Sequence, residues 1–238
     1  LAPLAIGAAA VTLLGWRAGV IFGVAALCAI EIWRGRAVSR YGGPGEVESR
    51  KSAGALPRRT YWAVIASMCY VGAEFCMSLW GVQLIEERAG LSAAAASAGL
   101  SAFLGGLFVG RVVGSGPARR LDAERLLRGV LVAGLLAFAL TWLATSAWLL
   151  LPSFFLTGVA LALSYPLNLA RVLRAADGQV DRAAAINLAA STAAIGAAPF
   201  LLGGLAGSMS VHSAFLVVPA LLLVALVVVI ARPVPDIG

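Results

Sequence analysis

The sequence predicts an all-α integral membrane protein built as a bundle of transmembrane helices. Hydrophobic residues make up 61% of the chain and charged residues 12%, and the mean hydropathy is +0.94. A soluble domain usually carries about 25% charged residues. Long charge-free stretches recur along the chain, and arginines gather in alternate connectors between them. These observations exclude a soluble fold with one large core.

Eight apolar stretches are candidates for membrane spans, which need about 20 residues in a helix. They fall near residues 1–14, 17–33, 61–85, 91–114, 126–145, 147–170, 183–207 and 213–231. The first is only a half-span. We therefore expect preceding sequence to complete it, and the chain to be a fragment of a longer protein.

Basic residues mark one side of the membrane. Sixteen of the eighteen lysines and arginines lie on alternate connectors. These are residues 34–60, 111–128 and 171–182, with Arg232 after the last span. The positive-inside rule places these connectors in the cytoplasm and predicts a multi-pass protein of the cell (plasma) membrane. Because the arginines follow membrane sidedness and form no single basic face, we expect no nucleic acid as a partner.

The longest connector, 34–60, divides the chain. It contains Gly42-Gly43-Pro44-Gly45 and charges of both signs, which is typical of a flexible linker between two bundles. The expected parts are the end of an N-terminal bundle (1–33), a cytoplasmic linker (34–60), a C-terminal six-helix bundle (61–232) and a cytoplasmic tail (233–238).

One acid is isolated in the middle of the span 61–85. Glu74 is the only charged residue among the 25 residues of that span. An ionised carboxylate at the bilayer centre costs roughly 2.5–3.5 kcal/mol, so the group has to face protein or water. Glu74 is therefore the candidate proton-coupling residue, with a role in packing between helices as the alternative.

Polar side chains form stripes on the same span and on two others. On 61–85 the members recur at intervals of three or four residues and share one helix face. They are Ser67, Tyr70, Glu74, Ser78 and Gly81, and the other two spans carry Ser153, Thr157, Ser164, Tyr165 and Asn168, then Asn187 and Ser191. We expect a solute to bind at Tyr70, Ser78, Thr157, Ser164, Tyr165, Asn168 and Asn187. Hydrogen bonding between helices is the alternative for both asparagines.

Three glycines at four-residue spacing, Gly106, Gly110 and Gly114, allow a neighbouring helix to approach closely. They fit either packing alone or a sliding surface that gates the pathway. Arg111 lies among them and is expected to gate, to pair with an acid or to anchor at the headgroups. Pro166 is expected to bend its span, because proline removes a helical hydrogen bond.

Three stretches of the chain resemble the major facilitator superfamily. Ala2-Pro3, Gly7 and Gly15-Trp16-Arg17 are similar to the end of the family's fifth helix and the turn into its sixth. Gly110-Arg111-Val112-Val113-Gly114, with Arg119-Arg120 and Arg125, resembles the loop between the eighth and ninth helices. Tyr70-Val71-Gly72-Ala73-Glu74 is similar to the seventh helix of the sugar-permease branch, which contains fucose and glucose/galactose transporters.

The resemblance implies that the chain is a major facilitator-type helix bundle, running from the end of helix five through helix twelve. It implies a secondary transporter whose cavity is lined mainly by helices one, four, seven and ten. The spans 61–85 and 147–170 would be helices seven and ten, which agrees with their polar stripes. The expected partners are a small-molecule substrate, the lipid bilayer and the missing N-terminal helices of the same protein.

The favoured function is proton-coupled transport of a small polar organic solute, such as a sugar, by alternating access. Efflux of drugs or metabolites by antiport is one alternative, and a truncated, non-transporting membrane fragment is another. No intramembrane Asp pair, metal-ligand His cluster or Ser–His arrangement is present in the sequence, so we expect no enzymatic activity and no cofactor. His212, the single histidine, is expected at the surface.

Overall fold

The computed structural model describes residues 54–118 and 121–234, together with six helical positions between Ile21 and Ile32. The chain divides into two compact units, Leu1–Lys51 and Ser52–Gly238. The second unit holds all six spans expected between residues 61 and 231.

Several sequence expectations fall outside the described residues. They concern the half-span 1–14, nearly all of the span 17–33, the linker up to residue 53, the pair Arg119 and Arg120, and residues 235–238.

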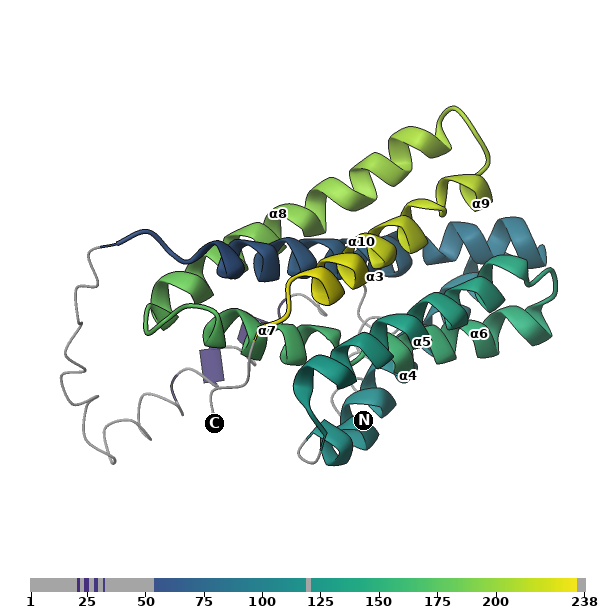
Figure 1. The fold of residues 1–238 in the computed structure, drawn as a ribbon. Helices are drawn as coiled ribbons and strands as arrows, with labels where there is room; N and C mark the ends of the chain where they lie inside the picture. Colours follow the sequence, from purple (N-terminus) through teal and green to yellow (C-terminus); the bar gives the residue numbers. More distant parts are fainter. Residues whose placement is uncertain are drawn as a thin grey trace. The chain divides into compact units, whose positions relative to one another are not determined.

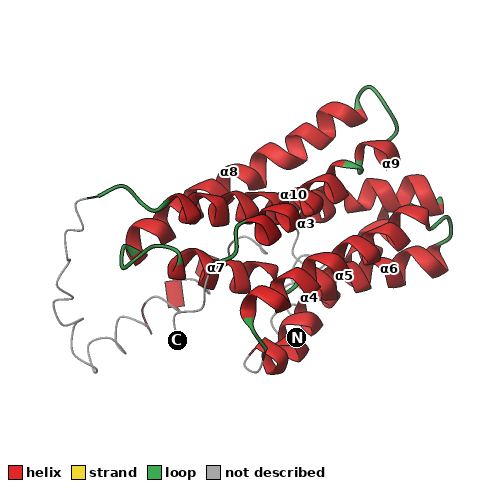
Figure 2. Ribbon diagram, viewed as in Figure 1, coloured by secondary structure: helices red, strands yellow, loops and turns green. Residues whose placement is uncertain are grey.

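Six helical spans make up the second unit (Figure 1). Their helices are α3 (Arg58–Ala89), α4 (Ala93–Ala118), α5 (Ala123–Leu143), α6 (Ala147–Leu161), α7 (Ser164–Arg174), α8 (Val180–Ala206), α9 (Val211–Ala214) and α10 (Val217–Ala231). Figure 2 shows helices joined by short loops, with no strand among the residues that the structure describes. The all-α fold and the six predicted spans between residues 61 and 231 are confirmed.

Local chemistry sets several helix ends. Helix α3 ends at Gly90, whose φ of 62° is left-handed and whose N–H donates to the Glu86 carbonyl at 3.0 Å. Helix α5 begins after Asp122, whose carboxylate accepts from the Arg125 N–H at 2.9 Å. Such caps replace the hydrogen bonds that terminal peptide groups cannot form within the helix.

Two of the six spans are interrupted, each four residues before a proline. Helix α6 ends at Leu161 and α7 begins at Ser164, upstream of Pro166. Pro166 has no N–H, so it cannot donate to the carbonyl of Ala162. The helix is therefore interrupted at Ala162 and Leu163, and the bend expected at Pro166 stays a prediction. Pro219 has the same relation to the break between α9 and α10.

Glycines bring α4 and α6 into backbone contact. A Cβ atom at Gly106 would lie 2.1 Å from the Phe155 carbonyl oxygen, and one at Gly158 would lie 2.2 Å from that of Phe103. Gly110 faces Val159 and Ala162 in the same way, and Gly114 faces Leu163. Neither helix could keep this separation with a larger side chain at these positions. The close approach expected from the three spaced glycines is present, and α6 contributes a fourth glycine to it.

We predict that Gly106→Ala destabilises the bundle by about 1–3 kcal/mol, because the new methyl group displaces the α6 backbone. Gly105→Ala is the matched control, since nothing lies within 4 Å of a Cβ at Gly105. Thermal unfolding of both variants in detergent checks this. Equal melting temperatures for the two variants would show that the helices separate easily.

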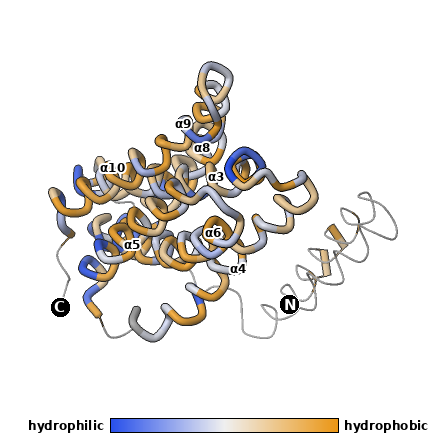
Figure 3. Tube along the Cα trace, turned by 90° about the vertical axis from the view of Figure 1, so that its right-hand side faces the viewer, coloured by the Kyte–Doolittle hydropathy of each residue, from blue (hydrophilic) through white to orange (hydrophobic). Residues whose placement is uncertain are grey.

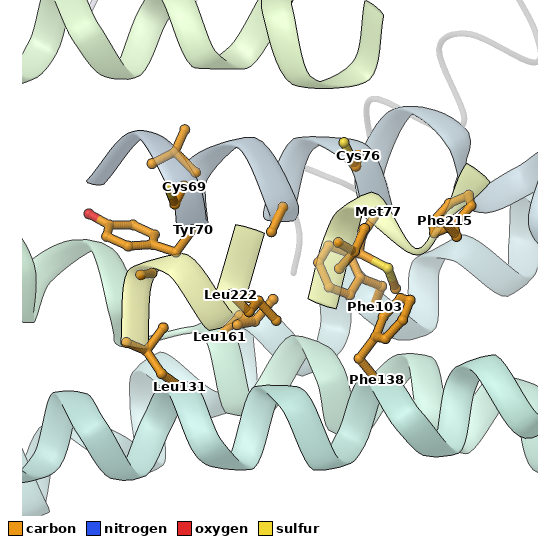
Figure 4. Packing of buried hydrophobic residues seen from close by; sticks show 14 of the residues in the cluster. Cys69, Tyr70, Cys76, Met77, Phe103, Leu131, Phe138, Leu161, Phe215 and Leu222 are labelled. Atoms are coloured by element: carbon orange, nitrogen blue, oxygen red, sulfur yellow. The ribbon is translucent and has the colours of Figure 1, made fainter. Parts of the chain in front are cut away.

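Helix α3 is the most buried of the six spans and packs against α4, α6, α7, α8 and α10. Figure 4 shows part of the core around it, where Met77, Phe103 and Phe138 converge from three helices. Leu161, Phe215 and Leu222 belong to the same buried cluster.

The outer surface of the bundle is apolar. Phe200, Leu136 and Val227 are 84%, 65% and 61% exposed, and the helices in Figure 3 are coloured mainly as hydrophobic. So much exposed apolar surface is unfavourable in water, whereas lipid tails accommodate it. This surface and the six long apolar helices indicate a multi-pass membrane protein.

Contacts between distant segments define the two ends of the bundle. At the end that we call the arginine-rich end, Thr60 donates to the Ala175 carbonyl at 2.7 Å, and Arg59 forms an ion pair with Asp177. Arg182 donates to the carbonyl of Gly54 at 2.6 Å. The start of α3 therefore lies beside the segment that joins α7 to α8.

At the opposite end, the connectors that are poor in basic residues meet. Arg88 donates to the Ala144 carbonyl at 3.0 Å, and Glu87 accepts the backbone N–H of Val211 at 2.9 Å. His212 was expected at the surface but is half-buried, because its ring stacks on Trp142 with centroids 4.4 Å apart.

Candidate functional site

The predicted polar faces of α3 and α7 meet inside the bundle. The Asn168 side-chain amide on α7 donates to the Ala63 carbonyl at 2.9 Å and to the Ser67 hydroxyl at 2.6 Å, both on α3. The Tyr70 hydroxyl donates to the same Ser67 oxygen at 3.2 Å. All three side chains are buried. The expected approach of these two stripes is therefore observed at Ser67, Tyr70 and Asn168.

Helix α8 carries further polar side chains at the same depth in the bundle as the contact between α3 and α7. Ala183 on α8 packs in one cluster with Ala63 on α3. About three turns along α8, Ala194 and Ala198 approach Gly72 on α3. Asn187 and Ser191 lie between these two contact points on α8, as Ser67 does on α3. The register therefore places the two α8 side chains beside the α3–α7 contact, and both are buried.

Several polar atoms at this junction lack a hydrogen-bond partner within the described part of the chain. They are Ser164 Oγ, Asn168 Oδ1, both side-chain polar atoms of Asn187, and Ser191 Oγ. Buried polar groups are nearly always hydrogen-bonded to protein or to ordered water. We call Ser67, Tyr70, Ser164, Asn168, Asn187 and Ser191 the polar cluster. Its neutral donors and acceptors suit hydroxyl groups or water better than an apolar molecule.

Glu74 lies one helical turn beyond Tyr70 on α3 and is half-buried. The positive charge of Arg111, on α4, acts on its carboxyl group. Arg111 itself is exposed. The structure thus brings Glu74 into electrostatic range of Arg111. Sequence spacing alone could not pair these two residues.

The similarity of the chain to known proteins is a similarity of fold. No family profile and no curated protein sequence matches the chain. Among solved structures, the chain is similar to FucP, a major facilitator superfamily transporter, in its outward conformation. The TM-score is 0.67 at 19% sequence identity, over 74% of this chain and 42% of that one. The N162A variant of the E. coli fucose:proton symporter FucP gives the same TM-score and identity, with 43% of its length covered.

The chain has the major facilitator fold. It spans about two fifths of the length of these structures, and the match covers a share of this chain close to that of the six-span unit. The expectation of a major facilitator-type bundle, drawn from three short sequence stretches, is confirmed for the fold.

Two other predicted site residues, Thr157 and Ser78, form their hydrogen bonds away from the polar cluster, whereas Tyr165 lies close enough to Tyr70 for the two hydroxyl groups to interact electrostatically. The Thr157 hydroxyl is buried against α5, 3.1 Å from the Thr141 hydroxyl, and donates to the Ser153 carbonyl at 2.8 Å. Ser78 donates to the carbonyl of Glu74 at 3.0 Å within its own helix. Tyr165 is half-buried and packs against the main core. Thr157 and Ser78 already have their hydrogen bonds within the bundle.

Sequence reasoning missed a buried ion pair at the arginine-rich end. Arg171 Nε on α7 lies 2.7 Å from Glu124 Oε1 on α5, and both side chains are buried. Arg171 also donates to the Arg232 carbonyl, and Glu124 accepts the Val234 N–H at 3.3 Å. The pair therefore joins α5, α7 and the segment after α10. The one signal in the sequence was an acid in the first turn of a helix within an arginine-rich connector.

We predict that Arg171→Gln lowers the free energy of unfolding by about 3–5 kcal/mol, because the Glu124 carboxylate is left buried without its cation. The double variant E124Q/R171Q recovers part of this loss, since both groups are then neutral. Arg125→Gln is the control, because Arg125 is exposed and lies 4.0 Å from Asp122. Thermal unfolding in detergent measures all three. If Arg125→Gln lowered the melting temperature and Arg171→Gln did not, the structural role of the Arg171–Glu124 pair would be contradicted.

Proposed function

We propose that the protein is a secondary transporter that moves a small polar organic solute, such as a sugar, by alternating access and with proton coupling. The observation that carries the proposal is the buried polar cluster with its unpaired oxygens and amides, one member of which, Ser164, directly follows the helix break at Ala162 and Leu163. Solute and ion sites of secondary transporters lie near discontinuous helices between the two halves of the molecule. The similarity to FucP, a fucose:proton symporter, supports the same function.

In this proposal Glu74 is the coupling residue and Arg111 its alternating partner. With Glu74 ionised, the two opposite charges attract each other. Protonation of Glu74 removes the attraction and leaves Arg111 to move with α4. The glycine contact between α4 and α6 lets the two helices shift at close range. A proton is thereby linked to the movement of one helix against another.

The remaining assignments belong to the same proposal. The bundle 61–232 works with N-terminal helices of the same protein, and the solute lies between the two bundles. The arginine-rich end faces the cytoplasm of a cell membrane by the positive-inside rule. Efflux by antiport is less favoured, because the cluster offers neutral hydrogen-bonding groups in place of a large apolar pocket.

Glu74→Gln tests the coupling role. We expect proton-driven accumulation of the solute by the full-length protein to fall at least tenfold, while exchange of solute across the membrane without a proton gradient persists. The glutamine keeps the shape of the side chain but cannot ionise. Glu86→Gln, on the same helix but near the opposite end, is the matched control and should transport normally. Unchanged accumulation by Glu74→Gln in proteoliposomes would rule out coupling through this residue.

Asn187→Leu tests the solute role of the polar cluster. Neither polar atom of the Asn187 side chain is bonded within the described chain, so an apolar replacement should leave stability unchanged or slightly raised. We expect solute binding to weaken about two- to tenfold, the equivalent of one hydrogen bond.

Asn168→Leu provides the contrast, because it also removes two bonds to α3 and should lower both stability and binding. Binding by titration calorimetry and thermal unfolding separate the two effects. If Asn187→Leu bound the solute as the native protein does and unfolded at a lower temperature, Asn187 would be a structural residue only.

A further inference from the structure

A hollow at the arginine-rich end is separate from the polar cluster. It measures about 450 Å³ and is formed by the first two turns of α3 and the residues just after α10. Its lining residues are Arg58, Arg59, Tyr61, Trp62, Ile65, Arg232 and Pro233. The polar cluster lies on the side of α3 that packs against α7 and α8, whereas this hollow opens on the α10 side.

Among the residues that the structure describes, the charge of the lining is positive. Three arginines contribute to it, and no acid within residues 54–118 and 121–234 does. Arg59 is already compensated by its ion pair with Asp177. Arg58 and Arg232 are exposed, and the Arg232 guanidinium lies 5.2 Å from the centre of the Trp62 ring. Two guanidinium groups are therefore available to an anion that enters the hollow.

The other lining residues belong to a membrane surface. Tyr61 and Trp62 are of the amphipathic aromatic type that gathers at the level of lipid headgroups. Ile65, about one turn further along α3, is 37% exposed, and the long apolar spans of α3 and α10 begin and end beside the arginines. An occupant therefore meets positive charge at one end and a hydrocarbon-facing surface at the other.

Hydrogen bonds to the buried ion pair hold the rim of the hollow in place. The Arg232 carbonyl accepts a hydrogen bond from Arg171, and the Val234 N–H donates to Glu124. The buried ion pair thus fixes the backbone on both sides of Pro233. A preformed site loses less conformational entropy when a ligand binds than a flexible one does.

We propose that this hollow binds the phosphate headgroup of an anionic phospholipid from the adjacent leaflet. The Arg58 and Arg232 guanidinium groups donate to the phosphate oxygens, Trp62 lies against Arg232, and an acyl chain extends along Ile65. Arginine suits phosphate because its planar group can donate two parallel hydrogen bonds. The bound lipid ties the start of α3 to the end of α10.

The test is a lipid titration of the full-length protein in detergent, followed by native mass spectrometry. Phosphatidylglycerol should bind more tightly than phosphatidylcholine. The variant R58Q/R232Q should bind phosphatidylglycerol on the order of 30-fold more weakly, at about 1 kcal/mol per arginine. Arg125→Gln, which removes an exposed arginine at the same end of the bundle but outside the hollow, should bind as the native protein does.

Salt dependence and competition with a soluble anion test the proposal further. The unmodified protein should lose affinity for phosphatidylglycerol as salt rises from about 0.1 M to 1 M, where charges are screened, and this measurement needs no variant to fold. Displacement of the lipid by an equal concentration of soluble glycerol phosphate would overturn the assignment in favour of a free anion. Equal binding of the two lipids, or an equal loss in Arg125→Gln, would also overturn it.

Discussion

Every polar group buried in this helix bundle needs a hydrogen-bond partner from the protein, from bound water or from a solute, because lipid hydrocarbon offers none. Thr141, Ser153 and Thr157 find theirs locally, by donating to carbonyls one turn back in their own helices. Asn168 cannot, and its amide instead reaches across to α3. The junction of α3, α7 and α8 depends on that contact, and the atoms there that remain unpaired distinguish it from ordinary packing.

At the arginine-rich end, the same constraint applies to charged side chains. Arg171 is buried and therefore paired, with Glu124 and with the Arg232 carbonyl. Arg58 and Arg232 are exposed at the edge of the bundle and can meet lipid phosphate instead. One end of the bundle thus contains two classes of arginine, one that holds helices together and one that faces the membrane surface. The glycine contact between α4 and α6 needs no polar partner, because backbone packing alone holds it.

Much of this arrangement could be predicted from the sequence. A run of 25 residues whose single charge is Glu74 predicts a span, because its length and apolarity suffice. Proline chemistry predicts the break before Pro166, and regular spacing predicts the glycine contact. Helical periodicity also places Ser67 and Tyr70 on one face. Each of these features depends on residues close together in the chain.

The rest could not be predicted, because helical spacing gives a face but not the helix that it meets. Thr157 belongs to a polar stripe, yet the rotation of α6 turns it towards Thr141 on α5. The pairing of Arg171 with Glu124 joins residues 47 positions apart. His212 is half-buried because its ring stacks on Trp142, which lies in the last turn of α5, 70 positions away. Spacing within one helix carries no information about such partners.

The central claim is that the unpaired atoms of Asn187 and Ser191 face a solute or its water. An experimental structure of the full-length protein, at a resolution that shows ordered water, tests it most directly. The account predicts oxygen density from water or solute within about 2.7–3.2 Å of the Asn187 amide. A dry junction, in which Asn187 is hydrogen-bonded to another helix, would contradict it.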